Sequence, residues 1–363
     1  MISSEQLAQR KKRWRDFYSL GGSETQIMRV INYARPDAPK MPLLWPEYKQ
    51  ERIEWAWTMY LQRMEDSEWL EDDNIPCLHI LAGTEKFAEA FGCKVHRPRD
   101  SYFTGAIPMI HSPEDAEKVK IPRLEDTPLM LLFDIADELR DRAGKDAIFR
   151  IPGMMCPMDM VATIWDKTDL FASMLDEPES VKALCAKCRD FLVQFADAWF
   201  ERYGHDEFLG HYPGYYMNTG ISMTVDEIGN VSSEMYKEFF EEDLHFLSEL
   251  YGGMGIHCCA NSKHQWENLK RIPGLKLLNL DRPEAVLRES YEYFRDIAAM
   301  WPEKMEHNVP EPMENPRMDS IPKGCHLVLT ANASTRDEAL RALEHMNREY
   351  RVSARKYTPA QVQ

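Results

Sequence analysis

The length, composition and charge of the chain restrict the classes of protein to which it can belong. Its 363 residues are enough for one large domain or two ordinary ones, and 44% hydrophobic with 29% charged residues is ordinary for a well-packed globule. Lys and Arg number 44 against 60 Asp and Glu, which gives a formal net charge of −16. This acidic balance argues against nucleic acid and an anionic membrane surface as partners.

The N-terminus and the cysteines indicate the compartment. The first twenty residues lack the apolar run of a signal peptide, and no stretch reaches the roughly 18 apolar residues of a membrane span. The eight cysteines, of which Cys258 and Cys259 are adjacent, are therefore expected to be reduced thiols or metal ligands. We expect a cytoplasmic protein.

Helical and strand-like segments alternate from the N-terminus onward. Ser3–Leu20 has helical composition, and its basic patch from Arg10 to Arg15 is typical of a solvated helix face. A Pro-punctuated stretch then leads to Met41–Trp45, a candidate first strand. The next predicted elements are a helix near Glu51–Arg63, a strand at Cys77–Gly83, a helix at Asp126–Asp146, a strand at Ala147–Gly153 and a helix from Pro178 to Gly204.

The alternation continues to the C-terminus. The predicted elements are a strand at Gly214–Val225, a helix at Val231–Gly253, a strand at Gly253–Ala260, a short helix at Gln265–Ile272, a strand at Gly274–Leu280, a helix within Asp281–Lys323, a strand at Cys325–Thr330 and an amphipathic helix at Ser334–Arg351. Between Leu280 and Cys325 no strand is evident. The irregular segment Met300–Lys323 is a candidate lid or interface.

Strands separated by helices of 10 to 25 residues predict βαβ units and a parallel sheet. No change of composition marks a linker. We therefore predict an α/β fold with one domain over residues 1–363, a single (β/α)8 TIM barrel preceded by an N-terminal helical extension at 1–34.

His257 and Cys259 are candidate metal ligands. They are two residues apart on a predicted strand, so both side chains should project from one face while Cys258 points the other way. They also lie at the carboxyl end of that strand, where barrel active sites are built. Zinc takes both ligand types and keeps one position open in catalytic sites. Alternatively, both are ordinary buried residues, since cysteine packs well in protein cores.

Acidic residues after the strand at Gly214–Val225 could complete the site. Asp226 is a candidate third ligand. Alternatively, Asp226 or Glu227 orients His257 or acts as a general acid or base, or both are solvated acids at a helix start. Asn261 is a candidate hydrogen-bonding residue of the catalytic set. Apolar residues that should face the same mouth could line a pocket for substrate or cofactor, or could be plain core: Met154, Met155, Met158 and Tyr216.

Four stretches resemble, in their order, the uroporphyrinogen decarboxylase-like superfamily, which includes the decarboxylase of haem synthesis and zinc-dependent corrinoid methyltransferases. Val231–Leu280 carries the closest likeness, a helix followed by a strand that ends in His-x-Cys, with Asn261 two residues later. The other similar stretches are Tyr33–Trp45, Ile151–Cys185 and Lys323–Met346. The resemblance extends from about Arg35 to Tyr350 and implies the barrel fold.

The chain also departs from these relatives. The decarboxylase carries an Arg-rich motif after its first strand, which cradles substrate carboxylates, whereas this chain has WPEYKQERIEW at Trp45–Trp55. The methyltransferases usually supply a third zinc ligand, a Cys, after the last strand. Here that neighbourhood holds Ala331, Asn332 and Ala333, and Cys325 lies at the beginning of the strand.

The resemblance implies a zinc-dependent methyltransferase that moves a methyl group between a small substrate, or a thiol, and a corrinoid cofactor on a partner protein. The metal would act as a Lewis acid. One alternative is a metal-free decarboxylase acting on a carboxylated small molecule, with Asp226 as acid or base, which clustered cationic groups at the mouth would favour. Another is a non-catalytic barrel that binds a corrinoid or tetrapyrrole. A homodimer is a further expectation for this fold.

Overall fold

The computed structural model describes residues 2–21, 26–99, 101, 104–303 and 321–356. The chain divides into two compact units. Unit 1 consists of residues 1–38, 61–76 and 275–363, and unit 2 consists of residues 39–60 and 77–274. Neither unit is one continuous stretch, since the chain passes from one to the other four times. The predicted single domain over 1–363 stays a prediction.

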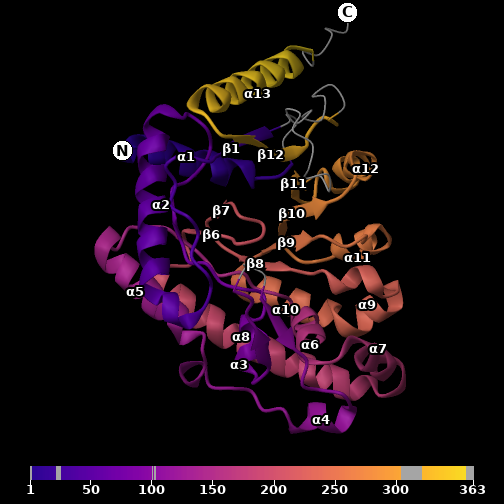
Figure 1. The fold of residues 1–363 in the computed structure, drawn as a ribbon. Coiled ribbons are helices and arrows are strands. Elements are labelled where there is room, and N and C mark those ends of the chain that lie inside the picture. The colour runs from indigo at the N-terminus through magenta and orange to yellow at the C-terminus, as the bar shows by residue number, and fades with distance from the viewer. Residues whose placement is uncertain (1, 22–25, 100, 102–103, 304–320, 357–363) are drawn as a thin grey trace, which may run out of the picture. The chain divides into compact units, whose positions relative to one another are not determined.

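Unit 1 is built on four parallel strands in the order β10-β11-β12-β1. Its elements are α1 (Ser4–Phe17), β1 (Gln26–Tyr33), the end of α2 (Lys49–Trp69), β10 (Leu275–Asp281), α12 (Glu284–Phe294), β11 (Ala299–Glu303), β12 (His326–Ala333) and α13 (Arg336–Lys356). β1 and β12 pair along their whole lengths, from Gln26 with His326 to Tyr33 with Ala333. The helix α13 packs against both strands, as Figure 1 shows.

The first strand differs from the prediction. Met41–Trp45 forms no strand, because Pro39, Pro42 and Pro46 punctuate it and proline cannot donate to a ladder. The strand β1 lies instead within the predicted helical extension at 1–34. On the edge of β1 that does not pair with β12, side chains accept two of the backbone N–H groups. The buried carboxylate of Asp72 accepts from Ile31 N–H at 2.9 Å, and that of Asp73 accepts from Arg29 N–H at 2.7 Å.

Arg10 is buried, which corrects the interpretation of the basic patch from Arg10 to Arg15 as entirely solvated. Its guanidinium donates to the carbonyl oxygens of Leu70 at 2.6 Å and Asn74 at 2.7 Å, and it lies 3.5 Å from the carboxylate of Asp72. It also donates to the carbonyl oxygen of Ser67 at 3.2 Å, in the last turn of α2, where a helix leaves acceptors unpaired. The side chain therefore caps a helix instead of facing water.

Unit 2 contains the remaining elements. Its strands are β2 (Leu78–His79), β3 (Lys94–His96), β4 (Gly105–Ile107), β5 (Phe149–Arg150), β6 (Phe208–Leu209), β7 (Tyr216–Met217), β8 (Ile221–Thr224) and β9 (Met254–Cys258). Its α-helices, besides the start of α2, are α3 (Lys86–Ala90), α4 (Pro113–Lys118), α5 (Met130–Ala143), α6 (Pro157–Ile164), α7 (Lys167–Asp176), α8 (Pro178–Tyr203), α9 (Ser233–Phe239), α10 (Glu241–Tyr251) and α11 (Trp266–Leu269). Four short 3-10 turns lie at Pro46–Tyr48, Leu124–Asp126, Glu227–Asn230 and Lys263–Gln265.

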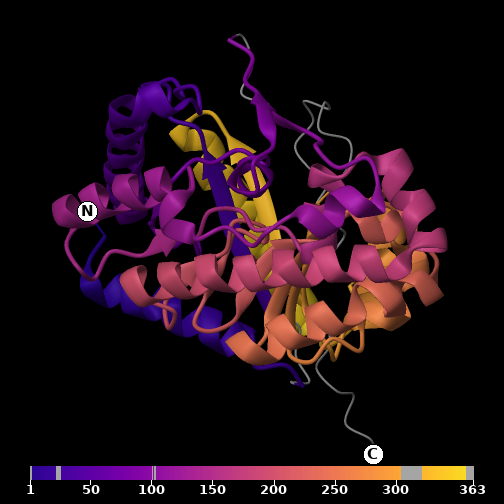
Figure 2. The same ribbon diagram turned by 90° about the horizontal axis from the view of Figure 1, so that it is seen from below.

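The core of unit 2 is organised by α8, which can be followed across the view in Figure 2. α4, α6 and α7 pack against it. Buried aromatic rings on α8 contact rings from α3, α5 and β5, mostly edge to face, as aromatic pairs prefer: Phe87, Phe91, Phe133, Phe149, Phe191, Phe195, Trp199 and Tyr203. The predicted helix from Pro178 to Gly204 thus lies at the centre of this aromatic core.

The register of β8 and β9 places the residues that follow them. These strands are parallel, with Ile221 opposite Met254 and Thr224 opposite His257. Two residues further, Asp226 is therefore opposite Cys259. On its other side, the end of β8 forms a parallel bridge with Met155, through hydrogen bonds from Thr224 N–H to Met154 O and from Cys156 N–H to Thr224 O, each 2.9 Å.

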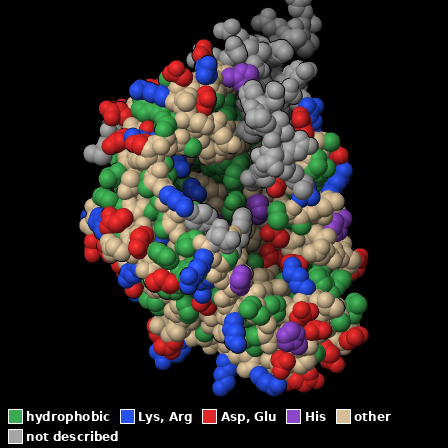
Figure 3. Space-filling view, in the orientation of Figure 1, with side chains coloured by type: hydrophobic (Ala, Val, Ile, Leu, Met, Phe, Trp, Pro, Cys, Tyr) green, Lys and Arg blue, Asp and Glu red, His purple; other side chains and the backbone are tan. Residues whose placement is uncertain are grey.

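The α/β class with mostly parallel pairing is confirmed. The antiparallel pairs of the described strands are β3 with β4 and β6 with β7. Within the described residues the strands form open sheets, so closure into a barrel stays a prediction. The candidate lid Met300–Lys323 lies mostly outside the described residues, which omit 304–320. Among the described helices, none combines the length and the apolar character needed to cross a membrane. Figure 3 shows basic and acidic side chains interspersed on the face viewed.

Candidate metal centre

The carboxyl ends of β8 and β9 bring three candidate ligands together. The carboxylate of Asp226, the imidazole of His257 and the thiol of Cys259 each offer a ligand atom, and these atoms all lie within 4.8 Å of one another. Cys259 is exposed, while Cys258 is buried and its thiol contacts Ser262 Oγ at 3.3 Å. The alternation predicted for this strand is therefore present: Cys258 faces the interior and Cys259 does not.

A chain of hydrogen bonds holds Asp226 in place. Its Oδ1 accepts the backbone N–H of Cys259 at 2.7 Å. Its own N–H donates to the carboxylate of Asp159 at 2.8 Å, and the N–H of Glu227 donates to the same carboxylate at 3.0 Å. Asp159 lies in the first turn of α6 and is 2% exposed. One buried carboxylate thus fixes the turn after β8, and through it the position of Asp226.

The environment of Asp159 favours its protonated form. Burial, together with the negative charge of Asp226, raises the pKa of its carboxyl to about 7, although the two backbone N–H groups that donate to it oppose the shift. Burial also raises the pKa of the neighbouring Cys258 thiol to about 12. Cys258 is therefore a protonated structural thiol, in contrast to the exposed Cys259.

His257 lies at one end of a row of ring contacts. The ring of Tyr212 packs on it, with centroids 4.7 Å apart, and Tyr212 also contacts His211. His211 contacts His79 of β2 at 5.8 Å between centroids. Burial, together with nearby cationic groups that include Lys86 and Arg150, lowers the pKa of His211 to about 3. His211 is therefore neutral near pH 7, beside a group of cationic side chains.

Glu227 and Asn261 are not part of the three-residue cluster. Glu227 is 9% exposed, and its carboxylate pairs with Lys167 Nζ and accepts from Asn230 Nδ2 at 2.9 Å. Asn261 is exposed on the loop after β9. The ion pair with Lys167 therefore gives Glu227 a structural role in the turn. A catalytic role for Glu227 or Asn261 stays a prediction.

The predicted pocket residues lie in the interior of unit 2. Met154, Met158 and Tyr216 are at most 2% exposed, and Met155 is partly buried. The sulfur of Met158 contacts the Cys185 thiol of α8 at 3.4 Å, so this side chain packs against that helix. A role of these four residues in binding a cofactor stays a prediction.

The donor set fits a zinc ion. A carboxylate oxygen, an imidazole nitrogen and a thiolate sulfur are all zinc ligands, with bonds of about 2.0–2.3 Å. In a tetrahedral site such atoms lie roughly 3.5 Å apart, so separations of up to 4.8 Å need to close by at most about 1 Å, within the reach of side-chain rotation.

Asp159 and His211 were not identified from the sequence. Asp159 is the one acidic residue in the apolar run Met154–Met160, and this isolated carboxylate was a signal that could have revealed it. His211 stands in a Pro- and Gly-rich loop, and nothing in that pattern distinguishes a buried imidazole from a surface one.

The fold and the cluster define an α/β protein with a candidate metal centre at the carboxyl ends of two parallel strands. Residues 81–206 match the family model of uroporphyrinogen decarboxylase (URO-D). In structure, the chain is similar to a methyltransferase from Methanosarcina mazei, with a TM-score of 0.68 and 13% sequence identity over 94% of this chain and 99% of that one. At that identity the likeness shows a shared fold alone. No curated protein matches the chain in sequence.

The family match and the shared fold together support the assignment of the chain to the uroporphyrinogen decarboxylase-like superfamily. The resemblance inferred from the sequence motifs is thereby confirmed.

Proposed function

We propose that the protein is a zinc-dependent methyltransferase that moves a methyl group between a small substrate, or a thiol, and a corrinoid cofactor. The cluster of Asp226, His257 and Cys259 carries this proposal, since its ligand atoms lie within 4.8 Å of one another and form a zinc-type donor set. The structural likeness to a methyltransferase supports the same choice within the superfamily.

The residues of the chain have distinct roles in this proposal. Asp226, His257 and Cys259 would hold the ion, which supplies Lewis acidity when bound. Asp159 keeps Asp226 in position, because its carboxylate accepts the N–H groups of Asp226 and Glu227. Tyr212, 38% exposed, covers one face of His257 and limits the access of water to it.

The proposal extends to the surroundings of the site. The barrel closes as a (β/α)8 TIM barrel in one domain over 1–363, with its mouth open to a corrinoid protein. The small-molecule methyl donor or acceptor binds at the same mouth. The protein acts in the cytoplasm, where Cys259 stays reduced, and pairs as a homodimer without nucleic acid or membrane partners.

Metal content tests the proposal. Purified protein is compared with a variant carrying His257→Ala and Cys259→Ala, and with His111→Ala as a control, because the His111 side chain is 62% exposed and lies outside the cluster. We expect about one zinc per chain in the parent and the control, and none in the double variant. Absence of zinc from the parent protein, even after reconstitution under reducing conditions, contradicts the proposal.

One observation favours a second candidate, a decarboxylase acting on a carboxylated small molecule. Cationic side chains cluster in unit 2, since Lys86 and Arg150 are close enough to His211 to lower its pKa. Such charges bind carboxylates, and this activity needs no metal. Turnover of a carboxylated substrate with release of carbon dioxide, unaffected by chelators, would favour this candidate over methyl transfer.

A further inference from the structure

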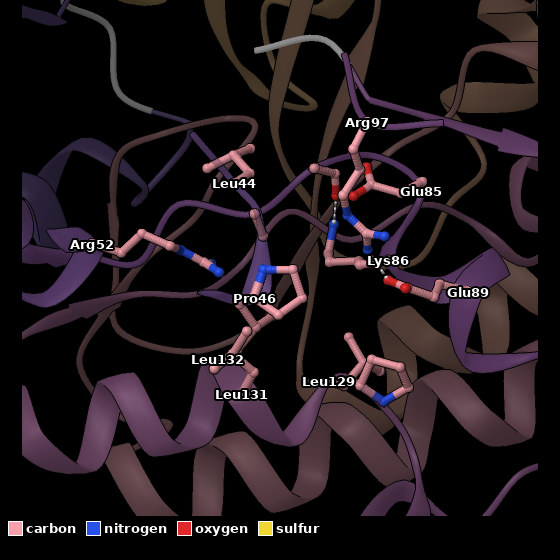
Figure 4. Close-up of a pocket in the computed structure, with 13 residues that line it drawn as sticks. Leu44, Pro46, Arg52, Glu85, Lys86, Glu89, Arg97, Leu129, Leu131 and Leu132 are labelled. Atoms are coloured by element: carbon pink, nitrogen blue, oxygen red, sulfur yellow. Dashed lines mark hydrogen bonds and ion pairs between the residues drawn. The ribbon is translucent and has the colours of Figure 1, made fainter. Parts of the chain in front are cut away.

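Unit 2 contains a small cavity apart from the candidate ligands. It lies between the start of α2, the loop after β2, the helix α3 and the residues that lead into α5, and its volume is about 50 Å³. Leucines including Leu44, Leu129 and Leu132 form part of its wall. Three cationic side chains, Arg52, Lys86 and Arg97, complete the lining and extend toward one another in Figure 4.

Two of these cations are almost completely buried. Arg52 is 4% exposed and donates from its Nη2 to the carbonyl oxygen of Leu81, but its Nε–H has no hydrogen-bond partner among the described residues. Lys86 is 8% exposed and its Nζ donates to Gly83 O at 3.1 Å. An ammonium has three hydrogen atoms to donate, and a buried charge is costly unless it is paired.

The acidic residues of the cavity do not balance these charges. Arg97 pairs with Glu89, and its Nε–H is likewise buried without a partner among the described residues. The buried carboxylate of Glu85 accepts from the hydroxyl of Thr104. Three cations therefore face two carboxylates, and a surplus of one positive charge points into the cavity.

The pKa values of the two buried cations agree with an incomplete pairing. Burial lowers the pKa of Lys86 to about 8 and that of Arg52 to about 10, while the nearby charge of Glu85 only partly opposes these shifts. An anion in the cavity would stabilise the charged forms of both side chains and accept from the unpartnered N–H groups.

We propose that this cavity is a binding site for a small oxyanion, the carboxylate or phosphate group of a small-molecule ligand, held by Arg52, Lys86 and Arg97. One water molecule needs roughly 10–15 Å³ of cavity volume, so a cavity of about 50 Å³ accommodates the oxygens of one carboxylate or phosphate group. The proposal concerns a site outside the metal cluster and does not depend on zinc.

Thermal unfolding of the full chain tests the site. Metal-free protein is titrated with sodium phosphate and, separately, with sodium acetate, at an ionic strength kept constant with sodium chloride. We expect at least one of the two anions to raise the unfolding midpoint saturably, and the anion with the lower half-saturating concentration identifies the preferred group. No anion-specific shift in the parent protein overturns the proposal.

Variants assign the effect to the cavity. Lys86→Met and Arg97→Gln should each raise the half-saturating concentration by about 10-fold or more, since each removes a charged donor. Lys49→Met is the control, because Lys49 pairs with Asp134 on the surface and does not line the cavity. Should Lys86→Met not fold, the partly exposed Arg97 still gives a result. Equal shifts in the control and both cavity variants would indicate a general salt effect and overturn the proposal.

Discussion

The backbone N–H of Cys259 donates to Oδ1 of Asp226 at 2.7 Å, which links the loop after β9 to the turn after β8. The register of the two strands makes this contact unavoidable, because Thr224 and His257 are paired two residues earlier. A carboxylate and a thiol are thus brought together by backbone geometry, before any ligand is bound.

Replacing Asp226 should weaken metal binding more than it weakens the fold. Asp226→Asn keeps an acceptor for the N–H of Cys259 but removes the negative charge, so we expect zinc affinity to fall by about 10-fold or more. Competition with a chromogenic chelator measures this affinity. Asp134→Asn, on the surface of α5, is the control. Unchanged affinity in Asp226→Asn would remove Asp226 from the ligand set.

Asp159 should act as a positioning residue. Asp159→Asn keeps the size of the side chain, but its amide nitrogen cannot accept an N–H, so one of the two hydrogen bonds from Asp226 and Glu227 is lost. We expect zinc affinity to fall roughly 10–100-fold, as for other residues that orient a ligand. The visible spectrum of the cobalt-substituted protein should change as well, which a purely structural loss would not cause. An unaltered spectrum with reduced stability would assign Asp159 to folding alone.

Cys259 should be the cysteine that thiol reagents reach first. It is exposed, whereas the other seven cysteines are buried. We expect iodoacetamide to label one thiol in the folded protein, and bound zinc to slow this labelling strongly, since the reagent attacks the unliganded thiolate. Peptide mass analysis locates the label. Rapid labelling of Cys259 in zinc-loaded protein would show that its sulfur does not bind the ion.

Gly153 should tolerate no side chain. A Cβ at this position would lie 2.6 Å from Cδ2 of His211, so Gly153→Ala has to displace the imidazole. We expect a loss of about 1–3 kcal/mol in the free energy of unfolding, measured in urea. Gly105→Ala is the matched control, because a Cβ there meets no atom within 4 Å. Equal stability of the two variants would mean that His211 moves without cost.

His211 should make the protein sensitive to mild acid. Its pKa is lowered to about 3 in the folded chain from an ordinary value of 6.5, so below pH 6.5 the unfolded chain takes up a proton that the folded chain does not. The free energy of unfolding should therefore fall by about 2 kcal/mol from this group between pH 7 and pH 5. Urea unfolding of His211→Gln should show a smaller loss over this range. An identical loss would place the acid sensitivity elsewhere.

The sequence predicted the elements whose patterns are local. The long helix α8 has Pro and Gly at its ends, and the alternation around His257 gave both the strand β9 and the orientation of Cys258. β1 was missed because the polar residues Arg29 and Asn32 interrupt its apolar pattern. A strand can hold such residues only where distant side chains pair with them, as Asp73 does with Arg29. Similarly, β11 was not predicted between Leu280 and Cys325 because it contains Pro302, a residue that is uncommon within strands.

The candidate site was predictable only in part for the same reason. His257, Cys259 and Asp226 follow from strand ends, which are visible in sequence. The role of Asp159 depends on N–H groups 67 and 68 residues further along the chain, and the cavity of Arg52, Lys86 and Arg97 gathers residues from three separate segments. Contacts between residues so far apart in the sequence leave no local sequence pattern from which they could be predicted.

The pairing of β1 with β12 has a consequence for the order of events during synthesis. Gln26 finds its partner His326 only after about three hundred further residues have been translated. In the sequence, unit 2 lies wholly between these two strands, so it can pack its aromatic core around α8 in the meantime. We expect unit 1 to fold last, with the edge of β1 exposed on the nascent chain until then, which makes this strand the segment most dependent on chaperones.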